Sequence, residues 1–142
     1  MTGIVHGDFR LDNVLIDEQD RPAAVIDWEM ATLGDPLTDL ALMCVYGRLG
    51  EQVKGDEVVD ATCAPGFLSE EEIIARYAAK SDRDLSRFGF YIGLASYKLA
   101  VILEGIHYRY IHGQTVGDGF AAVGDVVPVL LDGGLQALKE DS

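Results

Sequence analysis

The sequence predicts a mainly α-helical fold with a small β-hairpin near its start, an α+β arrangement in which helices dominate. Two short β-prone runs, residues 14–17 and 23–26, flank the polar residues 18–22, and this pattern is typical of two strands joined by a loop of about five residues. After residue 34, helix caps and an apolar stripe with helical spacing follow one another. The chain contains no internal repeat or linker, so one domain is expected.

The first helix is expected over residues 37–48. Asp35 is a helix-capping residue, and the proline after it suits the first helical position. Gly47 and Gly50 indicate the end of this helix, and the aperiodic residues 51–68 are expected to form a loop.

The second helix is expected to begin at a capping box. Ser69 is followed three residues later by Glu72, the spacing at which each side chain can bond the backbone of the other. This helix is expected to end near Lys80.

The third helix has the clearest periodicity in the chain and is expected to begin near Leu85, capped by Asp84 and closed by Gly113. Its apolar residues alternate four and three apart, at Phe88, Ile92, Ala95, Leu99, Ile102 and Ile106. A last helix is expected over residues 117–138, bent or interrupted by Pro128.

Composition narrows the classes of partner. The 142 residues are 49% hydrophobic and 25% charged, the ordinary balance of a soluble globular protein. The net charge of −13 argues against nucleic acid or an anionic membrane as partner, because neutralising phosphates requires clustered Lys and Arg. A nucleotide could bind only if divalent cations or a basic element offset this charge.

Cysteine usage and hydropathy favour a cytoplasmic protein. Cys44 and Cys63 match no metal-binding spacing and are expected to be packed or incidental thiols in a reducing compartment. We expect no membrane span, which requires about 20 apolar residues, and find no signal-peptide pattern.

Two polar segments contain the residues suited to chemistry: residues 6–13, His-Gly-Asp-Phe-Arg-Leu-Asp-Asn, and residues 25–29, Val-Ile-Asp-Trp-Glu. Asp8 and Asn13 lie five apart in a loop after a strand, so a tight loop can direct both side chains toward one point. The hairpin then returns Asp27 to the same loop. Two carboxylates and an amide oxygen suit Mg²⁺, so the sequence predicts a magnesium site at these three residues.

Asp8 and Asn13 also have a simpler interpretation, since aspartate and asparagine commonly cap turns. One segment alone would favour that interpretation. Both segments, correctly ordered and separated by a hairpin, favour the metal site.

The pattern His-x-Asp-x-x-x-x-Asn, followed by an aspartate after a short hairpin, resembles the catalytic loop and metal-binding aspartate of protein-kinase-like phosphotransferases. Gly7 in place of arginine, and Trp28-Glu29 after Asp27, resemble the aminoglycoside phosphotransferase and choline kinase branch. Within that branch the chain looks most similar to the phosphotransferase-like domains related to those fused to some acyl-CoA dehydrogenases. The similarity runs from about Ile4 to the long helix near His107.

This resemblance implies a partial C-terminal lobe of a kinase-like fold over residues 1–142, with the catalytic loop and metal-binding hairpin in residues 1–29 and a helical subdomain in residues 35–142. It implies that Asp8 is the catalytic base, and that Asn13 and Asp27 hold Mg²⁺ on the phosphates of ATP. The acceptor would be a small-molecule hydroxyl, and the branch suggests a hydroxylated acyl compound or another small metabolite.

Three further residues have two interpretations each. His6 is expected to brace the catalytic loop by hydrogen bonding, with a second acid or base as the alternative. The resemblance suggests that Asp39 accepts hydrogen bonds from the loop backbone, and otherwise it is a solvated helix carboxylate. Arg10 could contact a phosphate or substrate carboxylate, or it could pair with Asp12.

The resemblance also implies that the N-terminal lobe, which carries a lysine and a phosphate-covering loop, is absent. No G-x-x-x-x-G-K-[ST] motif occurs. We therefore expect very weak ATP binding, negligible turnover and self-association through uncovered apolar surface, unless another polypeptide supplies the missing half. The alternatives are a non-catalytic remnant acting as an oligomeric interaction module and a metal-dependent hydrolase, although the latter lacks the extra ligands of a two-metal site.

Overall fold

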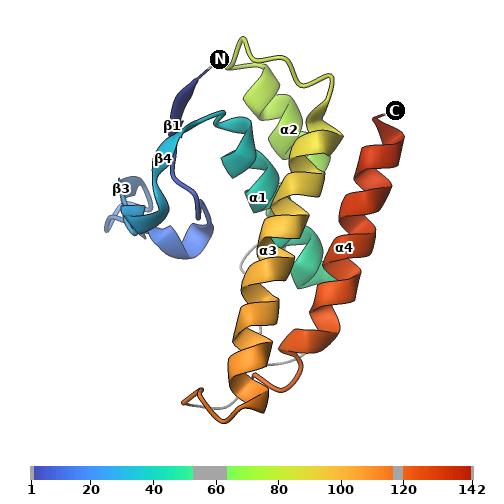
Figure 1. Cartoon of the computed structure of the whole chain (residues 1–142). Helices are drawn as coiled ribbons and strands as arrows, with labels where there is room; N and C mark the ends of the chain where they lie inside the picture. The colour runs from blue at the N-terminus through green and yellow to red at the C-terminus, as the bar shows by residue number, and fades with distance from the viewer. Residues whose placement is uncertain (1, 53–63, 117–119, 142) are drawn as a thin grey trace.

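The computed structural model describes residues 2–52, 64–116 and 120–141. Figure 1 shows strands gathered beside α1, while α3 and α4 run side by side. The strands and α-helices of these ranges are β1 (Gly3–Val5), β2 (Val14–Ile16), β3 (Pro22–Val25), β4 (Thr32–Gly34), α1 (Leu37–Gln52), α2 (Glu70–Ala78), α3 (Phe88–Ile111) and α4 (Val123–Glu140). The predicted fold class, mainly helical with a small β component, is confirmed.

The strands form two separate antiparallel pairs. β2 pairs with β3, with Val14 opposite Val25, and this is the predicted hairpin. β1 pairs with β4, with Ile4 opposite Leu33. The sequence did not predict this second pairing, because its two strands are short and no hairpin turn joins them along the chain. The pairing brings the loop after β1 beside the start of α1.

Helix α1 begins as predicted, since Asp35 Oδ1 accepts a hydrogen bond from Leu37 N at 3.1 Å. The prediction that it ends near Arg48 is wrong, because the helix continues to Gln52 through Gly47 and Gly50. Each glycine costs about 1 kcal/mol in a helix interior, and the packing of this helix against the core offsets that cost. Residues 53–63 of the expected loop lie outside the described residues.

The capping box of α2 is confirmed: Glu72 N donates to Ser69 Oγ at 3.2 Å, and Ser69 N donates to Glu72 Oε2 at 2.8 Å. The cap predicted for α3 is wrong. Asp84 Oδ1 accepts from Ser86 N at 2.8 Å, and α3 starts only at Phe88. A short aspartate side chain readily bonds the backbone two residues on, which here forms a turn before the helix.

Two predictions about helices α3 and α4 depended on a glycine and a proline. Gly113 follows α3 with φ +65°, a left-handed conformation that closes the helix as predicted. α4 begins at Val123 rather than Gly117, which lies outside the described residues, and it passes through Pro128 without interruption. Pro128 is close to the start of α4, where a proline removes one helical hydrogen bond, and packing against α3 holds the rest.

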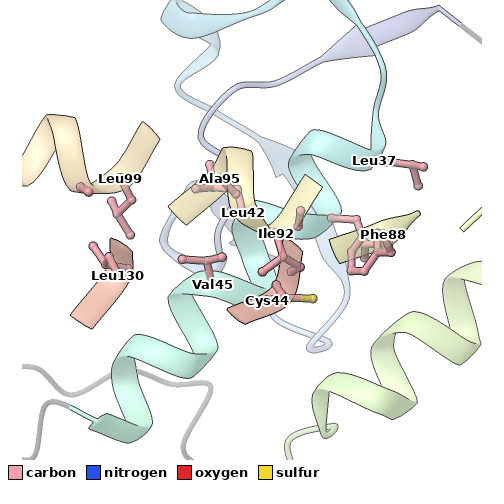
Figure 2. Packing of buried hydrophobic residues seen from close by; sticks show 13 residues of the cluster. Leu37, Leu42, Cys44, Val45, Phe88, Ile92, Ala95, Leu99 and Leu130 are labelled. Carbon is pink, nitrogen blue, oxygen red and sulfur yellow. The ribbon is translucent and has the colours of Figure 1, made fainter. Parts of the chain in front are cut away.

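The hydrophobic core lies where α1, α3 and α4 meet, as Figure 2 shows. The first four positions of the predicted stripe on α3 are buried in it, whereas Ile102 is exposed and Ile106 half-buried. Cys44 is buried and unpaired, and burial raises the pKa of its thiol to about 12. It is therefore a packed thiol, as expected; Cys63 lies outside the described residues.

Helix α3 is also long and apolar enough to cross a membrane by length and composition alone, with a mean hydropathy of 1.3 over its most apolar window. The expectation of no membrane span therefore stays a prediction. In the fold, α3 packs against α1 and α4, and a core helix of a soluble protein meets the same criterion.

Candidate active site

The loop between β1 and β2 depends on a glycine. Gly7 has φ +89°, a conformation that favours glycine. A Cβ atom at this position would lie 2.5 Å from the carbonyl oxygen of Met30. The loop can therefore approach the segment after β3 only because residue 7 has no side chain.

Helices α1 and α3 hold this loop by its backbone. Asp39 Oδ2 accepts a hydrogen bond from His6 N at 2.7 Å, and Asp39 Oδ1 accepts one from Gly7 N at 2.9 Å. On the other side, Lys98 Nζ of α3 donates to Gly7 O. These are the contacts expected of Asp39, which is not a freely solvated carboxylate.

Both ring nitrogens of His6 are engaged. Nδ1 accepts from Asp8 N at 3.2 Å, so Nε2 carries the proton and donates to Ile26 O at 2.8 Å. The residue is 3% exposed, and its ring packs against Trp28 with centroids 4.6 Å apart. This geometry favours the bracing role of His6 over a second acid or base, because neither nitrogen faces solvent.

Asp8 and Asn13 meet as the spacing predicts. Asn13 Nδ2 donates to Asp8 O at 2.8 Å and lies 3.4 Å from Asp8 Oδ2. The other carboxylate oxygen, Oδ1, accepts a hydrogen bond from the Tyr46 hydroxyl at 3.1 Å. Asn13 is 8% exposed, and its amide oxygen is left for a further ligand because the amide nitrogen bonds Asp8.

Asp27 is brought back to the loop by backbone contacts. Ile26 N donates to Asn13 O at 2.9 Å, and Ile26 O accepts from the His6 ring, so Asp27 follows a residue bonded to both. Its side chain is exposed, its φ is +65°, and although it precedes the short 3-10 helix Trp28–Met30, its side chain makes no capping hydrogen bond. In the described ranges no hydrogen bond joins this carboxylate to Asp8 or Asn13.

The donor set is limited to two carboxylates and an amide. Among residues 2–52, 64–116 and 120–141 no three His, Cys, Asp or Glu side chains gather where they could hold a metal. Zinc and two-metal hydrolytic sites use such clusters, whereas Mg²⁺ binds one or two carboxylates together with water and phosphate oxygens. The residues present therefore fit Mg²⁺ better than those alternatives.

Residues 1–79, more than half of this 142-residue chain, match the family described as phosphotransferase enzyme family. The chain belongs to this family. Acyl-CoA dehydrogenase family member 11 of mouse is 33% identical over 143 residues, which covers 96% of this chain and 18% of that protein. Mouse family member 10 is 35% identical over 118 residues, covering 80% of this chain and 11% of its own length.

A solved structure supports the same assignment. The crystal structure of a candidate aminoglycoside phosphotransferase from Ralstonia eutropha matches with a TM-score of 0.74 at 27% identity. The match covers 98% of this chain and 43% of that one. The resemblance to the aminoglycoside phosphotransferase branch, and to proteins of the acyl-CoA dehydrogenase group, is confirmed. This chain spans less than a fifth of the length of each of the two mouse relatives.

Arg10 makes the pair that one of its two interpretations predicted. Its guanidinium bonds Asp12 and lies 4.8 Å from the centre of the Tyr46 ring. Burial opposes the charge, but the hydrogen bond and charge of Asp12 outweigh it and raise the pKa of Arg10. The pair is partly exposed, so a phosphate could compete with Asp12, and a phosphate contact stays a prediction.

The sequence did not identify Tyr46 and Lys98. Tyr46 lies seven residues, or two helical turns, after Asp39 on the same helix, so a face shared with Asp39 was an available signal. Lys98 is the only Lys or Arg between Phe88 and Tyr108, and an isolated lysine in an apolar helix was a second available signal.

Proposed function

We propose that this chain carries the catalytic centre of an ATP- and Mg²⁺-dependent phosphotransferase that acts on a small-molecule hydroxyl. The observation that supports the proposal most strongly is the meeting of Asp8 and Asn13, together with the backbone bond from Ile26 to Asn13 that returns Asp27 to them. The family supports phosphoryl transfer in general, and these residues suggest how this chain takes part.

Asn13 and Asp27 are the residues that would hold Mg²⁺. The Asn13 amide nitrogen is occupied by Asp8, which turns its oxygen away as a neutral ligand, and the exposed Asp27 supplies a charged one. Bound Mg²⁺ would neutralise charge on the phosphates of ATP, which a chain with a net charge of −13 otherwise repels.

Asp8 would act on the acceptor. Its carboxylate takes the proton of the acceptor hydroxyl as the acceptor oxygen bonds the γ-phosphorus, and the bond from that phosphorus to the oxygen of ADP breaks. His6, Asp39 and Lys98 contribute by fixing the loop that carries Asp8, since phosphoryl transfer depends mainly on positioning and charge. A hydroxylated acyl compound is one acceptor to test.

We also propose that tight ATP binding needs a further lobe in addition to this chain. The chain spans 43% of the Ralstonia eutropha structure, and the rest of such a fold could supply the lysine and phosphate-covering loop. Alone, this chain is expected to bind Mg-ATP weakly.

Titration calorimetry of Mg-ATP, with a parallel assay for ADP release, tests the proposal. We expect weak heat that disappears in Asp27→Ala and any ADP release to disappear in Asp8→Asn. The control is Asp132→Ala, which removes an exposed carboxylate on α4. ADP release that persists in Asp8→Asn would contradict the catalytic assignment, and heat that persists in Asp27→Ala would contradict the metal assignment.

A second candidate is a non-catalytic module that self-associates. An apolar cavity of about 620 Å³ lies between α3, α1 and β4, and we call it the α3 groove. Its rim includes Leu94, Tyr97 and Val101, which are 45%, 61% and 53% exposed. We propose that a second copy of the chain covers it by helix pairing or exchange of segments.

Light scattering over a range of concentrations tests self-association. Tyr97→Glu in the α3 groove should shift the protein to monomers, whereas Glu104→Gln, also on an exposed part of α3, should leave its mass unchanged. A wild-type chain that is monomeric at all concentrations would exclude this second candidate.

A further inference from the structure

Tyr46 lies at the centre of a set of contacts around Asp8. Its hydroxyl donates to Asp8 Oδ1 at 3.1 Å across 38 residues of sequence. The Arg10 guanidinium covers one face of its ring at 4.8 Å, and Arg10 is itself paired with Asp12. The ring is therefore held from the same loop whose carboxylate it contacts.

Helix α1 reaches the loop at two points, seven residues apart. Asp39 binds the backbone of His6 and Gly7, and these bonds fix where the loop lies. Such bonds cannot fix the rotation of the Asp8 side chain, because a carboxylate can turn about its own bonds. Tyr46, two turns further along the helix, contacts the side chain itself.

The two oxygens of Asp8 have different partners. Oδ1 accepts from Tyr46 at 3.1 Å, while Oδ2 lies 3.4 Å from Asn13 Nδ2, at the long end of hydrogen bonding. The contact with Tyr46 is the shorter of the two, and Tyr46 is carried by helix α1. Asn13 would also be engaged with a cation under the proposed function.

We propose that Tyr46 is a positioning residue of this phosphotransferase, which orients the Asp8 carboxylate through its hydroxyl. Its catalytic consequence rests on the proposed function, whereas the contact itself does not. A base must point at the proton it accepts, and loss of orientation lowers the rate of the chemical step more than the binding of ATP.

Tyr46→Phe tests the proposal, because it removes the hydroxyl and keeps the ring under Arg10. Tyr77→Phe is the matched control: Tyr77 is also partly buried, and in the described part of the chain its hydroxyl makes no hydrogen bond. The first measurement is the carbon NMR signal of the aspartate carboxyl groups at neutral pH, with the Asp8 signal identified by its loss in Asp8→Ala.

We expect the Asp8 carboxyl signal to move in Tyr46→Phe more than that of any other aspartate, and to stay in place in Tyr77→Phe. An Asp8 signal that does not move would overturn the proposal. If Tyr46→Phe does not fold, the reverse measurement applies: Asp8→Ala should move the ring-carbon signal of Tyr46 beside its hydroxyl, and an unmoved signal would overturn the proposal.

The second measurement is phosphoryl transfer with Mg-ATP. Tyr46→Phe should lower kcat about 10- to 100-fold, the scale of one hydrogen bond to a charged group, and leave KM for Mg-ATP almost unchanged. A change in KM alone would indicate a merely structural role and overturn the proposal. Because this chain alone is expected to bind Mg-ATP weakly, a wild-type chain that shows no transfer leaves the NMR signals to decide the contact.

Discussion

The N-terminal segment of residues 2–34 and the bundle of α1, α3 and α4 are stabilised by different interactions. The buried hydrophobic cluster consists entirely of residues from the bundle, whereas the N-terminal segment buries Val5, His6 and Asn13 and exposes many of its large apolar side chains. The loop in that segment is held by hydrogen bonds to Asp39, Tyr46 and Lys98. The bundle is thus a rigid support, and the chemistry lies on a segment that depends on a few polar contacts.

The largest expected effect is the loss of stability when a core side chain of the bundle is truncated. Ile92 is 2% exposed in the core, so Ile92→Ala should lower the free energy of unfolding by about 2–5 kcal/mol, through lost burial and the cavity left behind. Urea denaturation measures it. Ile4→Ala, the same substitution at a residue 68% exposed on β1, should change it by no more than about 0.5 kcal/mol. Equal losses at the two positions would remove the distinction between the regions.

An intermediate effect is expected where the two regions meet. Asp39→Asn replaces one of the two carboxylate oxygens that accept from His6 N and Gly7 N with an amide nitrogen, which cannot accept a hydrogen bond. The lost bond to a charged group is worth about 1.5–3 kcal/mol. We expect amide hydrogen exchange to accelerate at these two residues while protection in α3 stays unchanged.

Asp132→Asn is the control for this experiment, since Asp132 is exposed on α4. Faster exchange throughout α3 in Asp39→Asn would contradict a local role and indicate that the loop and the bundle unfold together.

The smallest expected effect is on the free energy of unfolding at alkaline pH. Burial, and then the charge and hydrogen bond of Asp8, raise the pKa of Tyr46 to about 12. An unfolded tyrosine has a pKa of about 10, so the folded state holds this proton more tightly. The resulting stabilisation is complete below pH of about 10 and is lost as the pH rises toward about 12.

Tyr46→Phe removes this contribution, so its free energy of unfolding should fall less steeply than that of the wild type between pH of about 10 and 12. Urea denaturation at several pH values measures the difference. Parallel curves for Tyr46→Phe and the wild type would show that Tyr46 ionises equally in the folded and unfolded states.

The spacing of residues predicted what is local and missed what is distant, apart from the contacts of Asp39, which the family resemblance implied. The hairpin, the capping box of Ser69 and the meeting of Asp8 with Asn13 all depend on residues within about a dozen positions of each other, and each is present. The contacts of Tyr46 and Lys98 join residues 38 and 91 positions apart. No spacing rule covers such distances, because they depend on how α1 and α3 pack.

The helix ends were also only partly predictable. Gly47 and Gly50 are unfavourable in a helix by about 1 kcal/mol each, yet α1 passes through both because its apolar face packs against the core. Pro128 lies within α4 for the same reason. Local propensity was outweighed by packing that the sequence pattern alone does not reveal.

A manganese titration followed by NMR tests the central claim, that Asn13 and Asp27 hold one cation beside Asp8, most directly. Mn²⁺ suits the same oxygen ligands as Mg²⁺ and broadens the signals of nearby nuclei. We predict that substoichiometric Mn²⁺ broadens the amide signals of these three residues first, and that Asp27→Ala abolishes this selectivity. Broadening that begins elsewhere, on the acidic surface of α2 or α4, would contradict the account.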